Sequence, residues 1–371
     1  MLNEKNILFI VTGIKIGGLE TYLLRFLKSK KNKINPIILV QSLDKDDLFY
    51  EDFIKLGVKI VYLPIKFSPL SFSKFFSILK REKINCVCDF RGDFSGISLL
   101  FSSLANTKNR IVFYRESQFQ FKPTFLKNIY IRFLHFLTLK FSTKILSNSN
   151  QAFHSFYKKN ELNKKYHKVV RNGVFKKHNE KAYFYEDIRK KYSIPKNSFL
   201  IGHIGRFKPA KNHKLLVEIA KDLCKNQDDI YLLLCGSKIS ESINDDLTES
   251  CIREKVITPG LCTNIYPYLQ AMDVFVFPSL NEGQPNALIE AMTTGLPIVA
   301  SNIPSIKETV SEEMNQVLFS PSDKGAFVKE ILKIKNGQIS YNVNDAKIWS
   351  RNAYSQKDRF LEFYNELLHQ L

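Results

Sequence analysis

Cysteine is scarce in this chain of 371 residues, and its six cysteines form neither a CxxC pair nor a Cys/His cluster at zinc-ligand spacing. This pattern argues against a disulfide framework and against a structural zinc site. We therefore expect a protein of a reducing compartment.

Long apolar runs are missing as well, because no uncharged apolar stretch reaches 18 residues. The first apolar run, Ile7–Val11, is ended by Thr12, Gly13 and Lys15 and is too short for the core of a signal peptide. We expect a cytosolic protein that can touch a membrane surface.

Acidic residues are few in the first half only. Residues 1–190 contain 35 Lys and Arg against 15 Asp and Glu, a net charge of +20, whereas residues 191–371 contain 20 against 21, a net charge of −1. A basic half beside a neutral half predicts an anionic partner on one side: nucleic acid, an anionic membrane surface or a phosphorylated substrate.

Short apolar runs, each followed by a longer amphipathic stretch, recur along the whole chain. Runs without polar alternation are typical of strands buried on both faces, and helical spacers supply the crossovers of parallel sheets. The predicted strands are Ile7–Val11, Pro36–Val40, Val58–Leu63, Ile84–Phe90, Arg110–Tyr114, Lys144–Ser147 and Lys168–Val170, then Phe199–Ile204, Ile230–Cys235, Lys255–Thr258, Val274–Phe277, Pro297–Ala300 and Val317–Phe319. Two such sets predict two doubly wound α/β domains. The polar stretch 171–197 separates them, and an amphipathic helix ends the chain.

Three strand-to-helix turns are candidates for anion binding. The first contains Gly17 and Gly18, whose spacing fits neither dinucleotide nor Walker patterns, so a plain tight turn remains an equal alternative. The second contains Gly205, Arg206 and Lys211, a guanidinium fork and a mobile ammonium suited to a diphosphate, although a solvated basic loop is the commoner reading of such residues.

The strongest pattern follows strand Val274–Phe277, where a Gly/Pro loop leads into a helix. Glu282 lies on the loop and Glu290 about one turn inside the helix. A diphosphate at the helix start would meet unpaired N–H groups, and the two carboxylates would accept hydrogen bonds from sugar hydroxyls. The alternative, a helper carboxylate and a solvated one, leaves the surrounding Gly and Pro unexplained.

Together these residues resemble a known family, the retaining glycosyltransferase family 4. Glu282 to Glu290 is similar to its E-x7-E signature, and Gly205-Arg206 with Lys211-Asn212 to its donor-phosphate motif. The stretch Gly17-Gly18-Leu19-Glu20 resembles its glycine loop, and Arg171-Asn172-Gly173-Val174 its Asn-Gly element. The four motifs stand in the expected order over nearly the whole chain.

The resemblance implies a GT-B fold, in which two Rossmann-like domains face each other across a cleft. Residues 1–172 would form the acceptor-side domain, 173–352 the nucleotide-sugar domain, and 353–371 a helix returning to the first. It further implies that Arg206 and Lys211 hold the donor diphosphate and Glu282 the transferred sugar, and that no cofactor or metal is needed. The other implied donor-binding residues are Gly17, Gly18, Gly205, Gly283, Asn286, Ala287, Leu288 and Glu290, the last one on the ribose hydroxyls.

The sequence also departs from the family pattern. Where many members have an acceptor-side histidine, this chain reads Phe113-Tyr114-Arg115-Glu116-Ser117, so Arg115 is a candidate for an acceptor phosphate. The turn after the second strand of the donor domain reads Cys235-Gly236-Ser237-Lys238 instead of a glycine-rich sequence. Asp44-Lys45-Asp46 superficially fits a metal-binding D-x-D, but we interpret it as a helix start.

Two basic segments rich in aromatic residues, Lys66–Lys83 and Lys122–Lys144, match the charge excess of the first half. Such helices can lie on anionic lipid, yet their apolar positions fit core packing equally well.

We therefore predict an enzyme, a retaining glycosyltransferase that moves a sugar from a UDP- or GDP-sugar to a lipid-linked glycan acceptor in polysaccharide, O-antigen or capsule biosynthesis. A nucleotide-sugar epimerase of the same architecture is the alternative enzyme. A basic nucleic-acid-binding protein is the alternative from another class, but we find no nucleic-acid motif and expect no such partner. The sequence does not specify the donor base, the sugar, the acceptor or the oligomeric state.

Overall fold

The computed structural model describes residues 5–15, 17–30, 33–43, 49–115, 124–158, 161–163, 166–175, 186–225, 227–244, 247 and 250–369. Asp44-Lys45-Asp46 and Glu116-Ser117 lie outside these residues. The helix predicted to follow Asp46 is observed from Tyr50 to Ile54 (α2). No helix in the described part of the chain is long and apolar enough to cross a membrane.

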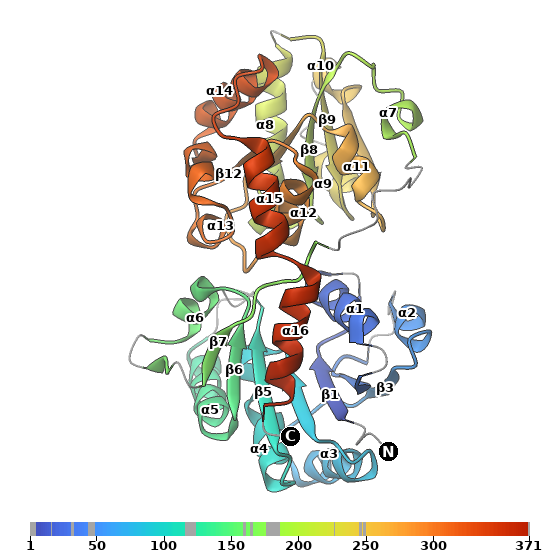
Figure 1. The fold of residues 1–371 in the computed structure, drawn as a ribbon, viewed down its shortest axis with the longest axis vertical. Helices are drawn as coiled ribbons and strands as arrows, with labels where there is room; N and C mark the ends of the chain where they lie inside the picture. The colour runs from blue at the N-terminus through green and yellow to red at the C-terminus, as the bar shows by residue number, and fades with distance from the viewer. Residues whose placement is uncertain are drawn as a thin grey trace. The chain divides into compact units, whose positions relative to one another are not determined.

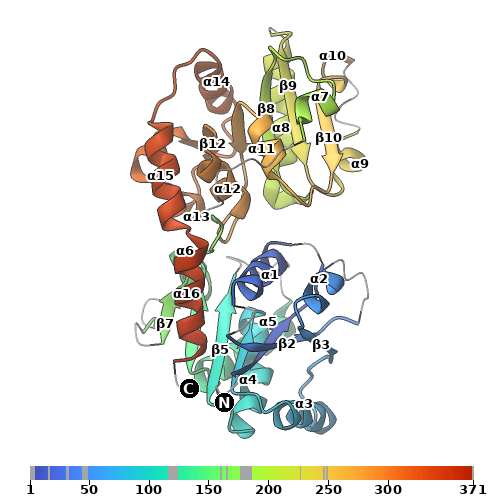
Figure 2. The same cartoon turned by 45° about the vertical axis from the view of Figure 1, so that its right-hand side comes forward.

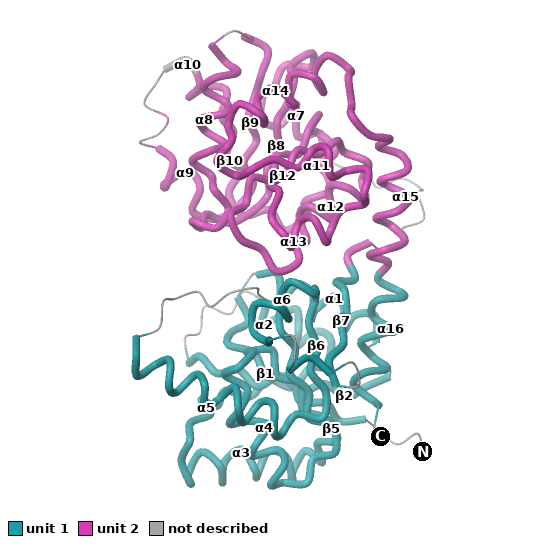
Figure 3. Tube along the Cα trace, turned by 90° about the vertical axis from the view of Figure 1, so that its left-hand side faces the viewer, with its two compact units in different colours: residues 1–173, 356–371 teal, residues 174–355 magenta. Residues whose placement is uncertain are grey.

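The chain divides into two compact units, residues 1–173 with 356–371, and residues 174–355 (Figure 3). It passes from the first unit to the second after Gly173 and returns after Ser355. A side chain at Gly173 would come within 2.8 Å of the Phe360 ring and 3.1 Å of the Gln356 Cα. Glycine is therefore required where these two passages of the chain approach each other in unit 1.

Unit 1 is built on a seven-stranded parallel sheet of order β3-β2-β1-β4-β5-β6-β7 (Figure 1). Its strands are β1 (Asn6–Val11), β2 (Asn35–Val40), β3 (Lys59–Tyr62), β4 (Cys86–Asp89), β5 (Asn109–Tyr114), β6 (Lys144–Ser147) and β7 (His167–Val169). The helices are α1 (Gly18–Lys30), α2, α3 (Pro69–Arg81), α4 (Gly96–Leu104), α5 (Phe125–Phe141), α6 (Asn150–Phe156) and α16 (Gln356–Leu367), with a 3-10 turn η1 (Gly92–Ser95).

Both faces of this sheet are covered, which explains its unbroken apolar strands. Alternate residues of β1 point to opposite sides: Phe9 packs in a core with α1, α2 and α16, and Leu8 in a core with α3, α4 and α5. Helix α16 joins the first core through Phe360 and Phe363, and the Phe363 ring lies 5.2 Å from that of Phe113 in β5. In Figure 2 this helix runs alongside β5.

Unit 2 is built on a six-stranded parallel sheet of order β10-β9-β8-β11-β12-β13. Its strands are β8 (Phe199–Ile204), β9 (Ile230–Cys235), β10 (Val256–Gly260), β11 (Val274–Phe277), β12 (Ile298–Ser301) and β13 (Leu318–Phe319). The helices are α7 (Ile188–Lys191), α8 (His213–Cys224), α9 (Ile239–Ile243), α10 (Ser250–Arg253), α11 (Tyr266–Ala271), α12 (Asn286–Thr294), α13 (Pro304–Lys307), α14 (Lys324–Lys335) and α15 (Val343–Ala353), with 3-10 turns η3 (Pro209–Lys211) and η5 (Glu312–Val317). Helices α8 and α14 cover one face of the sheet and α11, α12 and α15 the other.

Each of the thirteen predicted strand segments overlaps an observed strand, and both sheets are parallel and doubly wound. The predicted class, α/β with two Rossmann-like domains, is therefore confirmed.

Candidate functional site

The order of the second sheet singles out one crevice at its carboxyl edge. Strands β8 and β11 are neighbours, and the chain leaves β8 toward β9 on one side and β11 toward β12 on the other. The loops that follow β8 and β11 therefore diverge, and such a switch point is where doubly wound sheets bind ligands. The two strongest sequence motifs lie on these two loops, Gly205–Lys211 after β8 and Pro278–Pro285 after β11.

Backbone contacts fix the loop after β8. The Gly205 N–H donates to the Cys235 carbonyl at 2.8 Å, and the Phe207 N–H donates to the Ser237 carbonyl at 3.0 Å. A side chain at Gly236 would approach the Gly205 carbonyl oxygen to 2.2 Å, so only glycine allows the two loops to lie this close. The turn predicted to differ from the family pattern, Cys235-Gly236-Ser237-Lys238, thus supports the loop after β8. Arg206 is exposed on that loop.

Lys211 and Glu282, which come from different loops, form an ion pair. The Lys211 Nζ lies 2.7 Å from the Glu282 Oε1, and the two side chains are 19% and 11% exposed. The same ammonium lies 4.7 Å from the centroid of the Phe277 ring at the end of β11, a cation–π contact. The structure thus brings together two of the three predicted catalytic residues, and holds a positive and a negative charge side by side in a partly buried position.

Helix α12 begins four residues after Glu282. Its N-cap residue is Pro285, which makes no side-chain capping bond, so the N–H groups of the first turn, Asn286, Ala287 and Leu288, have no acceptor within the helix. The helix dipole adds positive potential at this end. Glu290 follows one turn later and is buried, at 5% exposure, so the alternative of a solvated Glu290 is wrong. Gly283 lies on the partly buried loop before the helix.

Two buried histidines lie beneath the loop after β8, and we did not predict them. The His203 Nδ1 lies 2.9 Å from the Val276 carbonyl oxygen, and the His213 Nε2 lies 3.3 Å from the Gly205 carbonyl oxygen. Their rings are 5.1 Å apart at nearly a right angle. Burial, with the nearby His213 and Lys211, lowers the pKa of His203 well below its usual range, and burial lowers that of His213 to about 4. Both rings are therefore neutral near pH 7 and add no charge under the loop.

Comparison with known proteins gives this geometry a context. Residues 184–356, which make up most of unit 2, match the sequence model of the family described as glycosyl transferases group 1. The chain is a glycosyltransferase. It is 26% identical over 95% of its length to the capsular polysaccharide biosynthesis glycosyltransferase CapH of Staphylococcus aureus, and covers 96% of that protein. It is 23% identical over 85% of its length to the UDP-Gal:alpha-D-GlcNAc-diphosphoundecaprenol alpha-1,3-galactosyltransferase of Escherichia coli, covering 86% of that enzyme.

Solved glycosyltransferase structures share the fold. The crystal structure of Anabaena HepE in complex with UDP-glucose superposes with a TM-score of 0.78 at 18% identity and covers 99% of this chain and 100% of its own. The likeness identifies the GT-B fold. The predicted family resemblance, fold and enzyme class of this glycosyltransferase are therefore confirmed.

The remaining predicted site residues lie in unit 1, at the carboxyl edge of its sheet. Gly17 precedes α1, and Gly18 is the first residue of that helix. Arg115 follows β5, and its guanidinium lies 3.8 Å from the centroid of the Tyr22 ring. Its Nη1 is buried without a hydrogen-bond partner among the described residues, and burial lowers the pKa of Arg115 to about 10.

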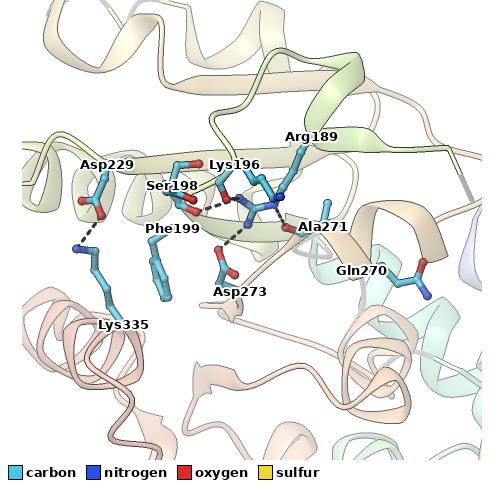
Figure 4. Close-up of a pocket in the computed structure, with 10 residues that line it drawn as sticks. Arg189, Lys196, Ser198, Phe199, Asp229, Gln270, Ala271, Asp273 and Lys335 are labelled. Atoms are coloured by element: carbon cyan, nitrogen blue, oxygen red, sulfur yellow. Dashed lines mark hydrogen bonds and ion pairs between the residues drawn. The ribbon is translucent and has the colours of Figure 1, made fainter.

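A pocket of about 460 Å³ lies at the opposite edge of the second sheet, where β8, β9 and β11 begin (Figure 4). The Arg189 Nη2 lies 2.7 Å from the Asp273 Oδ2, and the Lys335 Nζ lies 3.0 Å from the Asp229 Oδ2. These pairs attach α7 and α14 to the amino ends of the strands. The pocket is separate from the loops that carry the sequence motifs, so we assign it a structural role.

Proposed function

We propose that this glycosyltransferase moves a sugar from a UDP- or GDP-sugar to a lipid-linked glycan during bacterial surface-polysaccharide assembly, with retention of the anomeric configuration. The names of two relatives support the pathway and the acceptor: one acts in capsule biosynthesis, and the other acts on a diphosphoundecaprenol-linked sugar. The complex of HepE with UDP-glucose supports a nucleotide-sugar donor.

The observation that carries the proposal is the Lys211–Glu282 ion pair between the two diverging loops, with α12 beginning four residues after Glu282. A bound donor diphosphate accepts hydrogen bonds from Lys211, from Arg206 and from the first-turn N–H groups of α12. Glu282, released from the ammonium, accepts hydrogen bonds from hydroxyls of the transferred sugar, and Glu290 from the ribose.

The chemistry then follows from charge. As the bond between the anomeric carbon and the diphosphate oxygen breaks, negative charge grows on the leaving group, where these cations and dipoles stabilise it without a metal ion. The acceptor hydroxyl attacks from the same face as the leaving group. Its proton passes to a leaving-phosphate oxygen, so that the products are the glycoside and the nucleoside diphosphate.

The acceptor belongs to the side of unit 1 in this proposal. The guanidinium of Arg115, with its unpartnered Nη1, is suited to an acceptor phosphate. The enzyme works on the cytoplasmic face of the inner membrane, held there through the basic first half of the chain and without a nucleic-acid partner.

The test is a product-release assay with UDP- and GDP-sugars, each with and without a lipid-diphosphate glycan acceptor. We expect one donor to release its nucleoside diphosphate only when the acceptor is present, and NMR of the product to show the anomeric configuration of the donor. Lys211→Ala abolishes turnover in this account, while Lys214→Ala, an exposed lysine on α8, serves as the matched charge control. Consumption of a donor without any acceptor would instead establish the epimerase, and folded Lys211→Ala with wild-type turnover would refute the assignment of that residue.

A further inference from the structure

The amino-terminal half of α5 carries apolar side chains that are exposed in unit 1. Phe125 and Leu126 are 78% and 76% exposed, and the same side of the helix continues toward its middle. In Figure 3 this end of α5 reaches the margin of unit 1. We call the exposed set the α5 face; its members are Phe125, Leu126, Ile129, Tyr130, Phe133 and Phe136, with Phe67, whose ring lies 6.1 Å from that of Phe133.

The rest of α5 is firmly packed. Ile131, Leu134 and Leu137 are buried, and a side chain at Gly96 of α4 would come within 2.4 Å of the Leu134 carbonyl oxygen. The helix is therefore held in place from its middle onward and presents the α5 face on a fixed support. An exposed apolar surface of this extent on a monomer marks a contact with a partner.

Helix α3, the other basic aromatic segment, behaves differently. Its side chains Phe75, Ile78 and Leu79 are buried in the core of unit 1. From the sequence, core packing and membrane binding explained both segments equally well. The structure separates them only in part: the middle of α3 belongs to the core, whereas Phe67 and Leu70 at the start of that segment are exposed, and α5 carries the larger exposed apolar set.

The charged residues within α5 and α3 are all basic. Residues 124–141 contain three Lys and Arg and no Asp or Glu, and residues 66–81 contain four and none. Arg132 and Lys140 are exposed, and the Lys140 Nζ lies 5.6 Å from the centroid of the Phe136 ring. A second copy of the chain would bring like charges together, whereas an anionic partner with an apolar interior satisfies both the rings and the cations.

We propose that the α5 face inserts into the headgroup region of an anionic lipid bilayer. Phe125, Leu126 and Ile129 enter the acyl boundary, Tyr130 stays at headgroup level, and Arg132 and Lys140 contact lipid phosphates. This inference rests on the proposed function and deepens it, because a lipid-linked acceptor is presented at such a surface.

Vesicle flotation tests the proposal, with phosphatidylglycerol–phosphatidylethanolamine vesicles compared with phosphatidylcholine vesicles. We expect the wild-type protein to bind the anionic vesicles, and Phe125→Ser/Leu126→Ser to bind at least ~10-fold more weakly at any salt concentration, because apolar burial is lost. Arg132→Gln/Lys140→Gln should lose the salt-sensitive part of binding. Leu361→Ser, an exposed leucine on α16 of the same unit, is the matched control and should bind like the wild type.

A transfer assay on a water-soluble acceptor analogue separates this inference from the proposed function. The Phe125→Ser/Leu126→Ser protein should keep wild-type rates on the soluble analogue and lose turnover on acceptor embedded in vesicles. Two results would overturn the proposed membrane surface. One is vesicle binding that is unchanged in this variant. The other is a wild-type dimer in light scattering that the variant abolishes, while neither protein binds vesicles. Lipid binding through α5 with no transfer to any acceptor would overturn the proposed function alone.

Discussion

Replacing Glu282 by Gln should separate diphosphate binding from sugar transfer, because the Glu282 Oε1 lies 2.7 Å from the Lys211 Nζ. A donor diphosphate must draw the ammonium away from this carboxylate. The pair is partly exposed, and exposed pairs contribute ~0.2–1 kcal/mol, so losing the competitor strengthens the binding of a nucleoside diphosphate by up to ~5-fold. The sugar loses a charged acceptor at the same time, which costs ~1.5–3 kcal/mol, or ~10- to 150-fold in kcat/KM.

Lys211→Ala should act in the opposite sense on binding. It removes a charge-assisted hydrogen bond to the diphosphate and leaves the Glu282 carboxylate facing it, so the nucleoside diphosphate binds ~10- to 100-fold more weakly. Calorimetric titration with UDP and GDP, on proteins whose folding is checked by circular dichroism, measures both changes. If Glu282→Gln weakens the binding of the nucleoside diphosphate as much as Lys211→Ala does, the idea that the diphosphate replaces Glu282 as the partner of Lys211 is refuted.

Three further predictions concern other contacts of the structure. Gly236→Ala should displace the loop after β8, since the new Cβ would lie 2.2 Å from the Gly205 carbonyl oxygen. We expect the free energy of unfolding in urea to fall by ~1–3 kcal/mol and the binding of UDP or GDP to weaken. The control Gly325→Ala in α14 should leave both quantities unchanged. Partial burial alone would lower the pKa of His135, but its hydrogen bond to Asp93 raises the pKa overall. The stabilisation that this contact contributes is therefore full below the unfolded pKa of ~6.5 and is lost as pH rises through the folded pKa. The difference in urea stability between wild type and His135→Gln should shrink over that rise in pH, and a difference independent of pH would contradict the prediction. A hydrogen bond from Cys235 lowers the pKa of Cys262 to about 7, so iodoacetamide should modify Cys262 near neutral pH. Cys262→Ser is the control. A modification rate that rises only above pH 9 would contradict the lowered pKa.

The strands could be predicted because burial on both sheet faces leaves an unbroken apolar run in the sequence. The run Val274–Phe277 is buried throughout and coincides with β11. The start of α12 was also predictable, since Pro285 suits the residue just before a helix and Gly295, with a φ of 82°, ends it in the left-handed region.

Side-chain partners distant in the sequence were not predictable. Lys211 and Glu282 are 71 residues apart, and each was assigned to a substrate without any indication that they pair. His203 occupies a strand position like its apolar neighbours, and its contact with the Val276 carbonyl spans 73 residues. Arg115 is proposed for an acceptor phosphate, but the stacking of its guanidinium on Tyr22 was not predicted. Such contacts depend on which strands become neighbours, and local patterns do not contain that information.

Helical periodicity had a related limit at α3 and α5. Both helices repeat apolar residues at helical spacing, and this repeat is the same whether the apolar side meets a sheet or the solvent. Only the packing seen in the structure distinguishes the two outcomes: Ile131, Leu134 and Leu137 of α5 are buried, whereas the residues of the α5 face are exposed.

The Lys211–Glu282 ion pair also explains why the carboxyl edge of the second sheet can hold so much positive potential. The α12 start, Arg206 and Lys211 all present positive charge or dipole to one crevice, and without a bound anion they would repel one another. Glu282 neutralises the least exposed of these cations, and the neutral His203 and His213 add no charge beneath the loop. A dianionic diphosphate can then replace one carboxylate at Lys211 while the displaced carboxylate turns to the sugar. In the proposed mechanism Glu282 therefore couples donor binding to sugar recognition, and this coupling is what Glu282→Gln should abolish.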